Sequence, residues 1–91
     1  MNVREYCDIL NLNLIICRYC NQNERWSAHF EYCEIKTGSE SGILSSSYGD
    51  GKTAIDAIIN YLEKIEGNLL VVHAGSADMR REYIVPLGIE V

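Results

Sequence analysis

The stretch WSAHFEYCEIKTGSESGILSSSYGDGKTAIDAIINYLEKIEG, residues 26–67, decides the fold of this chain. In its first part Trp26, Ala28, Phe30 and Tyr32 alternate with Ser27, His29, Glu31 and Cys33. Such an alternation predicts a strand with one buried face, because successive side chains of a strand point to opposite sides. We expect this strand to run from Trp26 to about Ile35.

The end of the stretch predicts an amphipathic helix. Thr53 is a natural N-cap, and Asp56 suits the positive end of the helix dipole. Gly67 is the expected left-handed stop. The expected buried stripe consists of Ile55, Ile58, Ile59, Leu62 and Ile65. The expected exposed face consists of Asp56, Asn60, Glu63, Lys64 and Glu66.

Five further segments have the patterns of regular structure. They are a short helix near Val3–Leu10 and strands over Leu12–Tyr19, Ile43–Tyr48, Leu69–Ala74 and Arg81–Leu87. Turn-forming residues separate them, at a hairpin turn over Asn21–Glu24 and a loop over Thr37–Gly42. Pro86 marks the edge or end of the last strand.

This order of elements predicts an α+β fold. We expect an antiparallel sheet of four to five strands with one main helix packed on one face, in the order helix, three strands, helix, two strands. Residues 1–91 should form a single small domain.

Composition and net charge limit the classes of function that this chain can have. The chain has 91 residues, with 8 basic against 13 acidic ones and a net charge of −5. Such a charge disfavours nucleic-acid binding and permits a basic protein partner. Neither a signal peptide nor a membrane-spanning run is apparent, so we expect a cytoplasmic protein with reduced cysteines and no membrane association.

The residues GDGKT, which contain Gly49, Gly51, Lys52 and Thr53, form a candidate anion-binding turn. A glycine-rich turn before a helix exposes converging N–H groups. A phosphate-binding loop would need a glycine at position 46, where the chain has Ser46. The alternative is a structural turn in which the glycines supply positive φ.

The cysteines raise the possibility of metal binding. Cys17 and Cys20 have zinc-ligand spacing, and the remaining candidate ligands are Cys7, Cys33, His29 and His73. However, residues three apart on a strand point to opposite faces, and there is no second C-x-x-C pair. We therefore expect no metal and no cofactor. Since no nucleophile, base and orienting group stand together, we expect no enzymatic activity.

The predicted sheet has more apolar surface than one helix can cover. Ile15, Cys17, Tyr19 and His29 are candidates for an interface on the uncovered side, because leftover apolar residues commonly mark one. Arg80 and Arg81 are candidates for its polar rim. The alternative is that the N-terminal segment or the last strand covers these residues. A homodimer through a sheet edge or the uncovered face is also expected.

One resemblance adds to this interpretation. The run Trp26, Ala28 and Phe30, then residues 47–53, then Ala57-Ile58 and Tyr61-Leu62 resembles the HicB-like antitoxin domain over residues 26–67. The chain departs from that pattern because Gly51 and Lys52 separate Asp50 from Thr53, the proline-rich D-L-P-G-C stretch is missing, and no DNA-binding element follows. The resemblance implies a fold that masks a partner protein. The chain is also similar in style to small phage and prophage proteins.

Three functional classes follow. The leading hypothesis is a non-enzymatic protein-interaction module, a phage or mobile-element accessory protein that binds and inhibits a host or toxin protein. The second is a small-ligand binder or sponge, for a nucleotide or phosphate, that uses residues 49–53 and Arg80–Arg81. The third is an RNA-contacting domain, against which the net charge argues.

Overall fold

The computed structural model describes residues 1–19, 25–36 and 43–91. The elements are α1 (Val3–Leu10), β1 (Leu14–Tyr19), β2 (Arg25–Phe30), β3 (Cys33–Lys36), β4 (Leu44–Ser45), β5 (Gly49–Gly51), α2 (Ala54–Ile65), β6 (Leu69–Val72) and β7 (Arg81–Ile84). The α+β class is therefore confirmed. The predicted turns at Asn21–Glu24 and Thr37–Gly42 lie outside the described residues.

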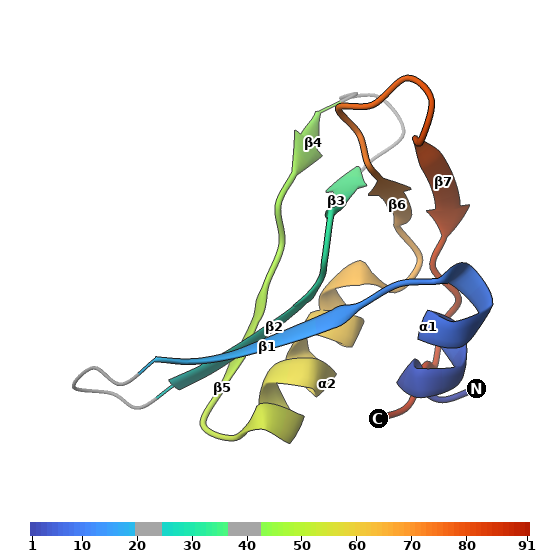
Figure 1. Ribbon diagram of the computed structural model, residues 1–91. Coiled ribbons are helices and arrows are strands. Elements are labelled where there is room, and N and C mark those ends of the chain that lie inside the picture. The colour runs from blue at the N-terminus through green and yellow to red at the C-terminus, as the bar shows by residue number, and fades with distance from the viewer. Residues whose placement is uncertain (20–24, 37–42) are drawn as a thin grey trace.

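The strands form two antiparallel sheets where one was expected (Figure 1). The three-stranded sheet has the order β1-β2-β5, and the four-stranded sheet has the order β4-β3-β6-β7. The prediction of one continuous strand from Trp26 to Ile35 was wrong, because the chain bends between β2 and β3 at Tyr32, whose φ is 60°. The single strand predicted over Ile43–Tyr48 was also wrong, since only Leu44–Ser45 of it pairs.

Besides the connection through α2, two chain segments without a helix pass from one sheet to the other. The first leads from β2 to β3, and the second leads from β4 to β5. The ladders that join these segments end at Ala28 opposite Gly49 and at Ile35 opposite Ser45. Between these pairs, residues 29–34 span the same gap as residues 46–48. The longer segment must therefore bend, and the two segments separate at the seam between the sheets.

Helix α2 packs on β5 and β2 of the three-stranded sheet. Its backbone lies so close to β5 that a Cβ added at Gly49 would be 2.1 Å from the Ala57 carbonyl oxygen, and one at Gly51 would be 2.6 Å from the Ala57 nitrogen. Positive φ occurs at Gly67 and Gly88 but not at these two glycines. The interpretation of Gly49 and Gly51 as a turn requiring positive φ was therefore wrong. They are glycines because the helix leaves no room for a side chain.

The same close approach rotates α2 from its expected orientation. The buried residues are Ala57, Ile58, Tyr61, Leu62 and Ile65. Ile55 and Ile59 of the predicted stripe are instead 58% and 38% exposed. The small Ala57 meets the glycine strand, and the Tyr61 ring lies edge-on against Phe30 at a centroid distance of 5.3 Å. The predicted N-cap is confirmed, since the Thr53 hydroxyl accepts a hydrogen bond from the Asp56 amide.

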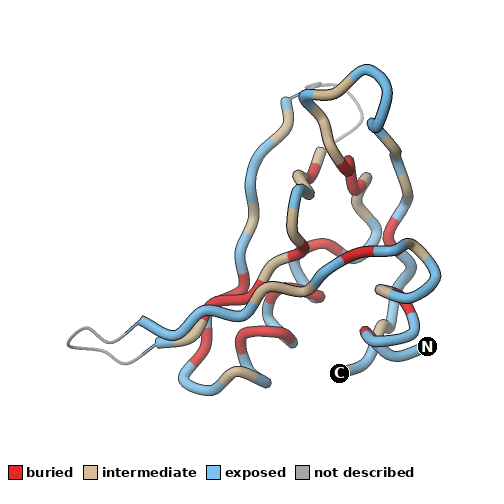
Figure 2. The backbone as a smooth tube through the Cα atoms, in the orientation of Figure 1, coloured by how far each residue is buried: buried red, intermediate tan, exposed pale blue. Residues whose placement is uncertain are grey.

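One apolar core joins both sheets and both helices. Figure 2 shows the buried residues of α2 against those of the sheet. Phe30 is fully buried and Trp26 is half-buried against the core, as expected. The predicted first helix is also confirmed as α1, whose Asn2 cap and Glu5 form reciprocal hydrogen bonds. The two ends of the chain meet where Asn2 and Glu90 form a parallel bridge (Figure 1).

Candidate functional site: an open sheet face and a seam cavity

The register of the three-stranded sheet gathers four predicted interface residues on one face. Ile15 lies opposite His29, Cys17 lies opposite Ser27, and Tyr19 lies opposite Arg25. Directly paired residues of an antiparallel ladder share a face. We call the set Ile15, Cys17, Tyr19, Ser27 and His29 the open face, because α2 packs against the opposite side of the same sheet.

The open face is partly exposed and has its own polar contacts. Cys17 and Tyr19 are exposed, whereas Ile15 and His29 are half-buried. Ser27 is buried, and its hydroxyl donates to the Tyr19 hydroxyl at 3.4 Å. The ring of Tyr48 lies edge-on to His29 at a centroid distance of 4.9 Å. The face therefore combines apolar, aromatic and polar groups, as protein interfaces do.

The structure does not bring Arg80 and Arg81 to this face. Arg81 belongs to β7 in the other sheet, where its guanidinium donates to the Leu10 carbonyl at 3.0 Å and lies over the Tyr83 ring. Arg80 forms an exposed ion pair with Glu82 at 3.6 Å. Arg81 thus connects β7 to the end of α1, and Arg80 is paired with Glu82 on the surface.

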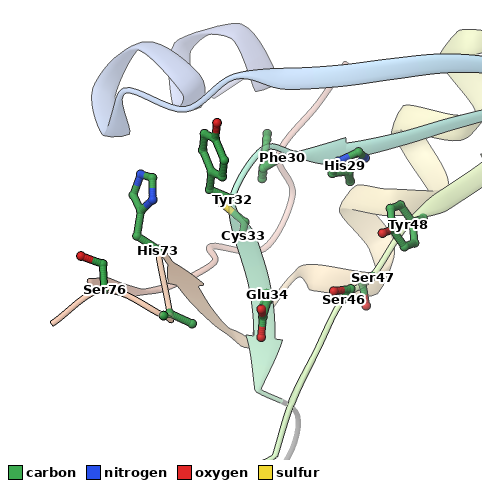
Figure 3. A pocket seen from close by; sticks show the side chains of 12 residues that line it. His29, Phe30, Tyr32, Cys33, Glu34, Ser46, Ser47, Tyr48, His73 and Ser76 are labelled. Carbon is green, nitrogen blue, oxygen red and sulfur yellow. The ribbon is translucent and has the colours of Figure 1, made fainter. Parts of the chain in front are cut away.

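A cavity of about 400 Å³ opens at the seam between the two sheets (Figure 3). We call it the seam cavity. Its lining comes from the two segments that change sheets and from the loop after β6: His29, Phe30, Tyr32, Cys33, Glu34, Ser46, Ser47, Tyr48, His73, Ala74, Gly75 and Ser76. His29 belongs to both sites, so the open face continues into the seam cavity.

Tyr32 and His73 form one wall of the seam cavity. Both residues have left-handed backbone conformations, with φ of 60° and 53°. The His73 amide donates to the Tyr32 carbonyl at 2.9 Å, and the two rings stack at 4.9 Å with planes 25° apart. A second cavity of about 400 Å³, which Asp78 and Arg81 help to line, touches the same two residues. Left-handed conformations of bulky residues cost free energy and concentrate at functional sites.

The charge of the seam cavity is set by a carboxylate. Its lining contains the Glu34 carboxylate and no lysine or arginine, and no ion pair of Glu34 occurs within the described part of the chain. The buried Nδ1 atom of His29 has no hydrogen-bond partner there. Burial raises the pKa of Cys33 to about 12, so this cysteine is a neutral thiol at physiological pH rather than a nucleophile.

The candidate anion-binding turn has a different geometry from the one expected. Gly49 and Gly51 are strand residues that pair with Ala28 and Trp26 and face α2. The Thr53 hydroxyl is occupied by the Asp56 amide. Lys52 is exposed. These residues therefore form an edge strand followed by a capped helix rather than a cup around an anion.

The described part of the chain has neither a group of metal ligands nor a helix that could span a membrane. Among residues 1–19, 25–36 and 43–91, no three His, Cys, Asp or Glu side chains are grouped to hold a metal ion. Cys20 of the C-x-x-C pair lies outside these ranges. Neither helix of the described chain has the length and apolar character needed to cross a membrane.

Comparisons with known proteins gave no likeness to argue from: no protein-family model matches the chain, and neither a curated protein nor a solved structure matches it.

Sequence reasoning missed most of the seam cavity. The sequence offers His73 only as a residue of a metal or acid–base site, and it predicts Tyr32 on the buried face of a straight strand, although Tyr32 is 65% exposed. Glu34 and Tyr48 had no assigned role. The cavity depends on the unequal lengths of the two crossing segments, and no local motif encodes that difference.

Proposed function

We propose that this protein is a non-enzymatic interaction module that docks a partner protein on the open face. The observation that carries the proposal is the register that places Ile15, Cys17, Tyr19 and His29 on the side of the sheet opposite α2. Tyrosine is enriched at protein interfaces because it offers a large apolar surface and a polar tip. The raised pKa of Cys33 argues against a catalytic thiol in the adjoining cavity.

The chain's acidity and its resemblance to the HicB-like antitoxin domain extend the proposal to the kind of partner. A net charge of −5 favours fast association with a basic protein. The resemblance adds the expectation that the partner is a toxin or host protein whose activity is inhibited, and that the chain comes from a phage or mobile element.

A position-dependent cross-linking experiment tests docking on the open face. A photo-reactive amino acid is placed at Tyr19 in the full chain and, as a matched control, at Ile55, which is exposed on α2. We expect one partner to cross-link from position 19 and not from position 55. With that partner purified, Tyr19→Ser should weaken binding about tenfold or more, as loss of an interface aromatic does. Equal cross-linking from both positions, or unchanged affinity of Tyr19→Ser, would contradict the proposal.

We also propose a homodimer through the free edge of β1. In the described chain β1 pairs only with β2, and Arg18 is the one charged residue along it. A long edge strand with so little charge pairs readily with another strand. Light scattering should give twice the chain mass of 10.3 kDa for the wild type. Ile16→Lys, which adds charge to that edge, should give the monomer mass. A monomeric wild type would refute the dimer.

A further inference from the structure

We infer that the seam cavity receives an arginine side chain of the partner protein. This inference rests on the proposed function, because it assigns the anchoring residue of a protein docked on the adjoining open face. Its starting point is that the cavity lies between two aromatic pairs. Tyr32 stacks on His73 along one wall, and His29 meets Tyr48 edge-on along another (Figure 3).

The charge of the cavity selects a cation. Glu34 lines it, and Figure 3 shows this side chain between the Ser46–Ser47 segment and the loop that carries Ser76. Among the described residues that line the cavity, no lysine or arginine neutralises the carboxylate. A phosphate or another anion would be repelled by Glu34, whereas a cation would gain both the carboxylate and the electron-rich ring faces.

The number and arrangement of acceptors favour a guanidinium over an ammonium group. Besides Glu34, the lining offers the hydroxyl oxygens of Ser46, Ser47 and Ser76. A guanidinium carries five N–H donors in a plane, so it can donate to several of these groups while it stacks on a ring. An ammonium group offers three donors and does not stack.

The backbone prepares the cavity for this ligand. The hydrogen bond from the His73 amide to the Tyr32 carbonyl holds both residues in left-handed conformations, which orients their rings before any ligand arrives. A wall fixed in advance lowers the ordering cost of binding. The strained pair therefore has a role that the packing of the core does not require, since Tyr32 is 65% exposed.

Titration of the isotope-labelled full chain with Nα-acetyl-arginine amide tests the inference without any partner. We expect saturable NMR shifts at His29, Glu34 and Ser76, with a dissociation constant of about 1–10 mM. The citrulline analogue has nearly the same shape but no charge, and it should bind about tenfold more weakly. The lysine analogue should fall between the two.

Matched variants locate the binding. Glu34→Gln should weaken arginine binding about tenfold, and Tyr48→Leu should also weaken it. Glu63→Gln, the same change on the exposed face of α2, should leave it unchanged. Equal binding of arginine and citrulline, no shifts at high arginine concentration, or shifts of the cavity residues by inorganic phosphate would overturn the inference. Because this titration needs no partner, its failure leaves docking on the open face standing, and failed cross-linking at Tyr19 leaves the arginine pocket standing.

Discussion

The two faces of the three-stranded sheet differ in how closely they are packed. On the helix side, backbone meets backbone, and even one methyl group at Gly49 would overlap with α2. On the open face, Cys17 and Tyr19 are exposed to solvent, and the Tyr19 hydroxyl accepts a hydrogen bond from the Ser27 hydroxyl. Where α2 covers the first face, at Gly49 and Gly51, there is no room for a larger side chain. The second face can change its side chains at little cost in stability, and for that reason it is the one available for function.

The largest effect is expected for Gly49→Ala. The added Cβ would lie 2.1 Å from the Ala57 carbonyl oxygen and 2.3 Å from the Tyr61 nitrogen, so the whole helix must shift. We expect the free energy of unfolding to fall by about 3 kcal/mol or more in urea denaturation, at the upper end of overpacking effects.

Gly75→Ala is the control for this substitution, because a Cβ at Gly75 would meet nothing within 4 Å. It should change the free energy of unfolding by no more than about 0.5 kcal/mol. If Gly49→Ala were equally mild, the close approach of α2 to β5 would be wrong, and the contrast between the two faces would disappear.

Removing the hydroxyl group from either of two buried tyrosines should have a medium effect on the free energy of unfolding. The two effects should differ in sign. The Tyr61 hydroxyl accepts a hydrogen bond from the Phe30 amide at 3.1 Å, whereas the buried Tyr6 hydroxyl has no partner in the described chain. Tyr61→Phe leaves a buried N–H unpaired and should destabilise the fold by about 1–3 kcal/mol. Tyr6→Phe removes an unpaired polar group and should be neutral or slightly stabilising.

Thermal or urea unfolding of both variants sharpens the comparison. The Phe30 amide lies beyond the last residue of β2 that pairs with β5, where the two sheets separate. Tyr61 therefore fulfils there the role that a neighbouring strand fulfils elsewhere. A Tyr61→Phe variant as stable as the wild type would mean that ring packing alone, rather than this hydrogen bond, holds the helix at the seam.

Local signals were sufficient for the two helices, for the buried face of β2 and for the fold class. The Thr53 cap and the left-handed Gly67 bound α2 as expected, and the alternation around Ala28 and Phe30 identifies the buried face of β2. These features depend on neighbours within a few residues. Local pattern is therefore enough to place them.

Long-range geometry decided what the sequence could not predict. The rotation of α2 follows from the contact of Ala57 with Gly49, eight residues back in the chain and across an interface. The bend at Tyr32 follows from pairing with the loop that begins at His73. The isoleucine stripe of α2 and the continuous strand from Trp26 to Ile35 both agreed with the local sequence pattern. The close packing of segments that are distant in the sequence determined a different structure in both places.

The smallest expected effect is a change in the free energy of unfolding at alkaline pH, and it concerns the Cys33 thiol at the seam. Burial raises the pKa of Cys33 to about 12 from a value near 9 in the unfolded chain. Between these values the folded protein binds more protons than the unfolded one, so the free energy of unfolding should decrease as the pH rises above about 9. Cys33→Ala should reduce this decrease without removing it, because burial also raises the pKa of Tyr6 to about 12.

Urea unfolding at about pH 8 and about pH 10.5 measures the difference. Cys17→Ala, which removes an exposed thiol on the open face, is the control for the loss of a cysteine side chain. A Cys33→Ala variant that loses as much stability as the wild type over this range would show that the thiol is not shielded at the seam.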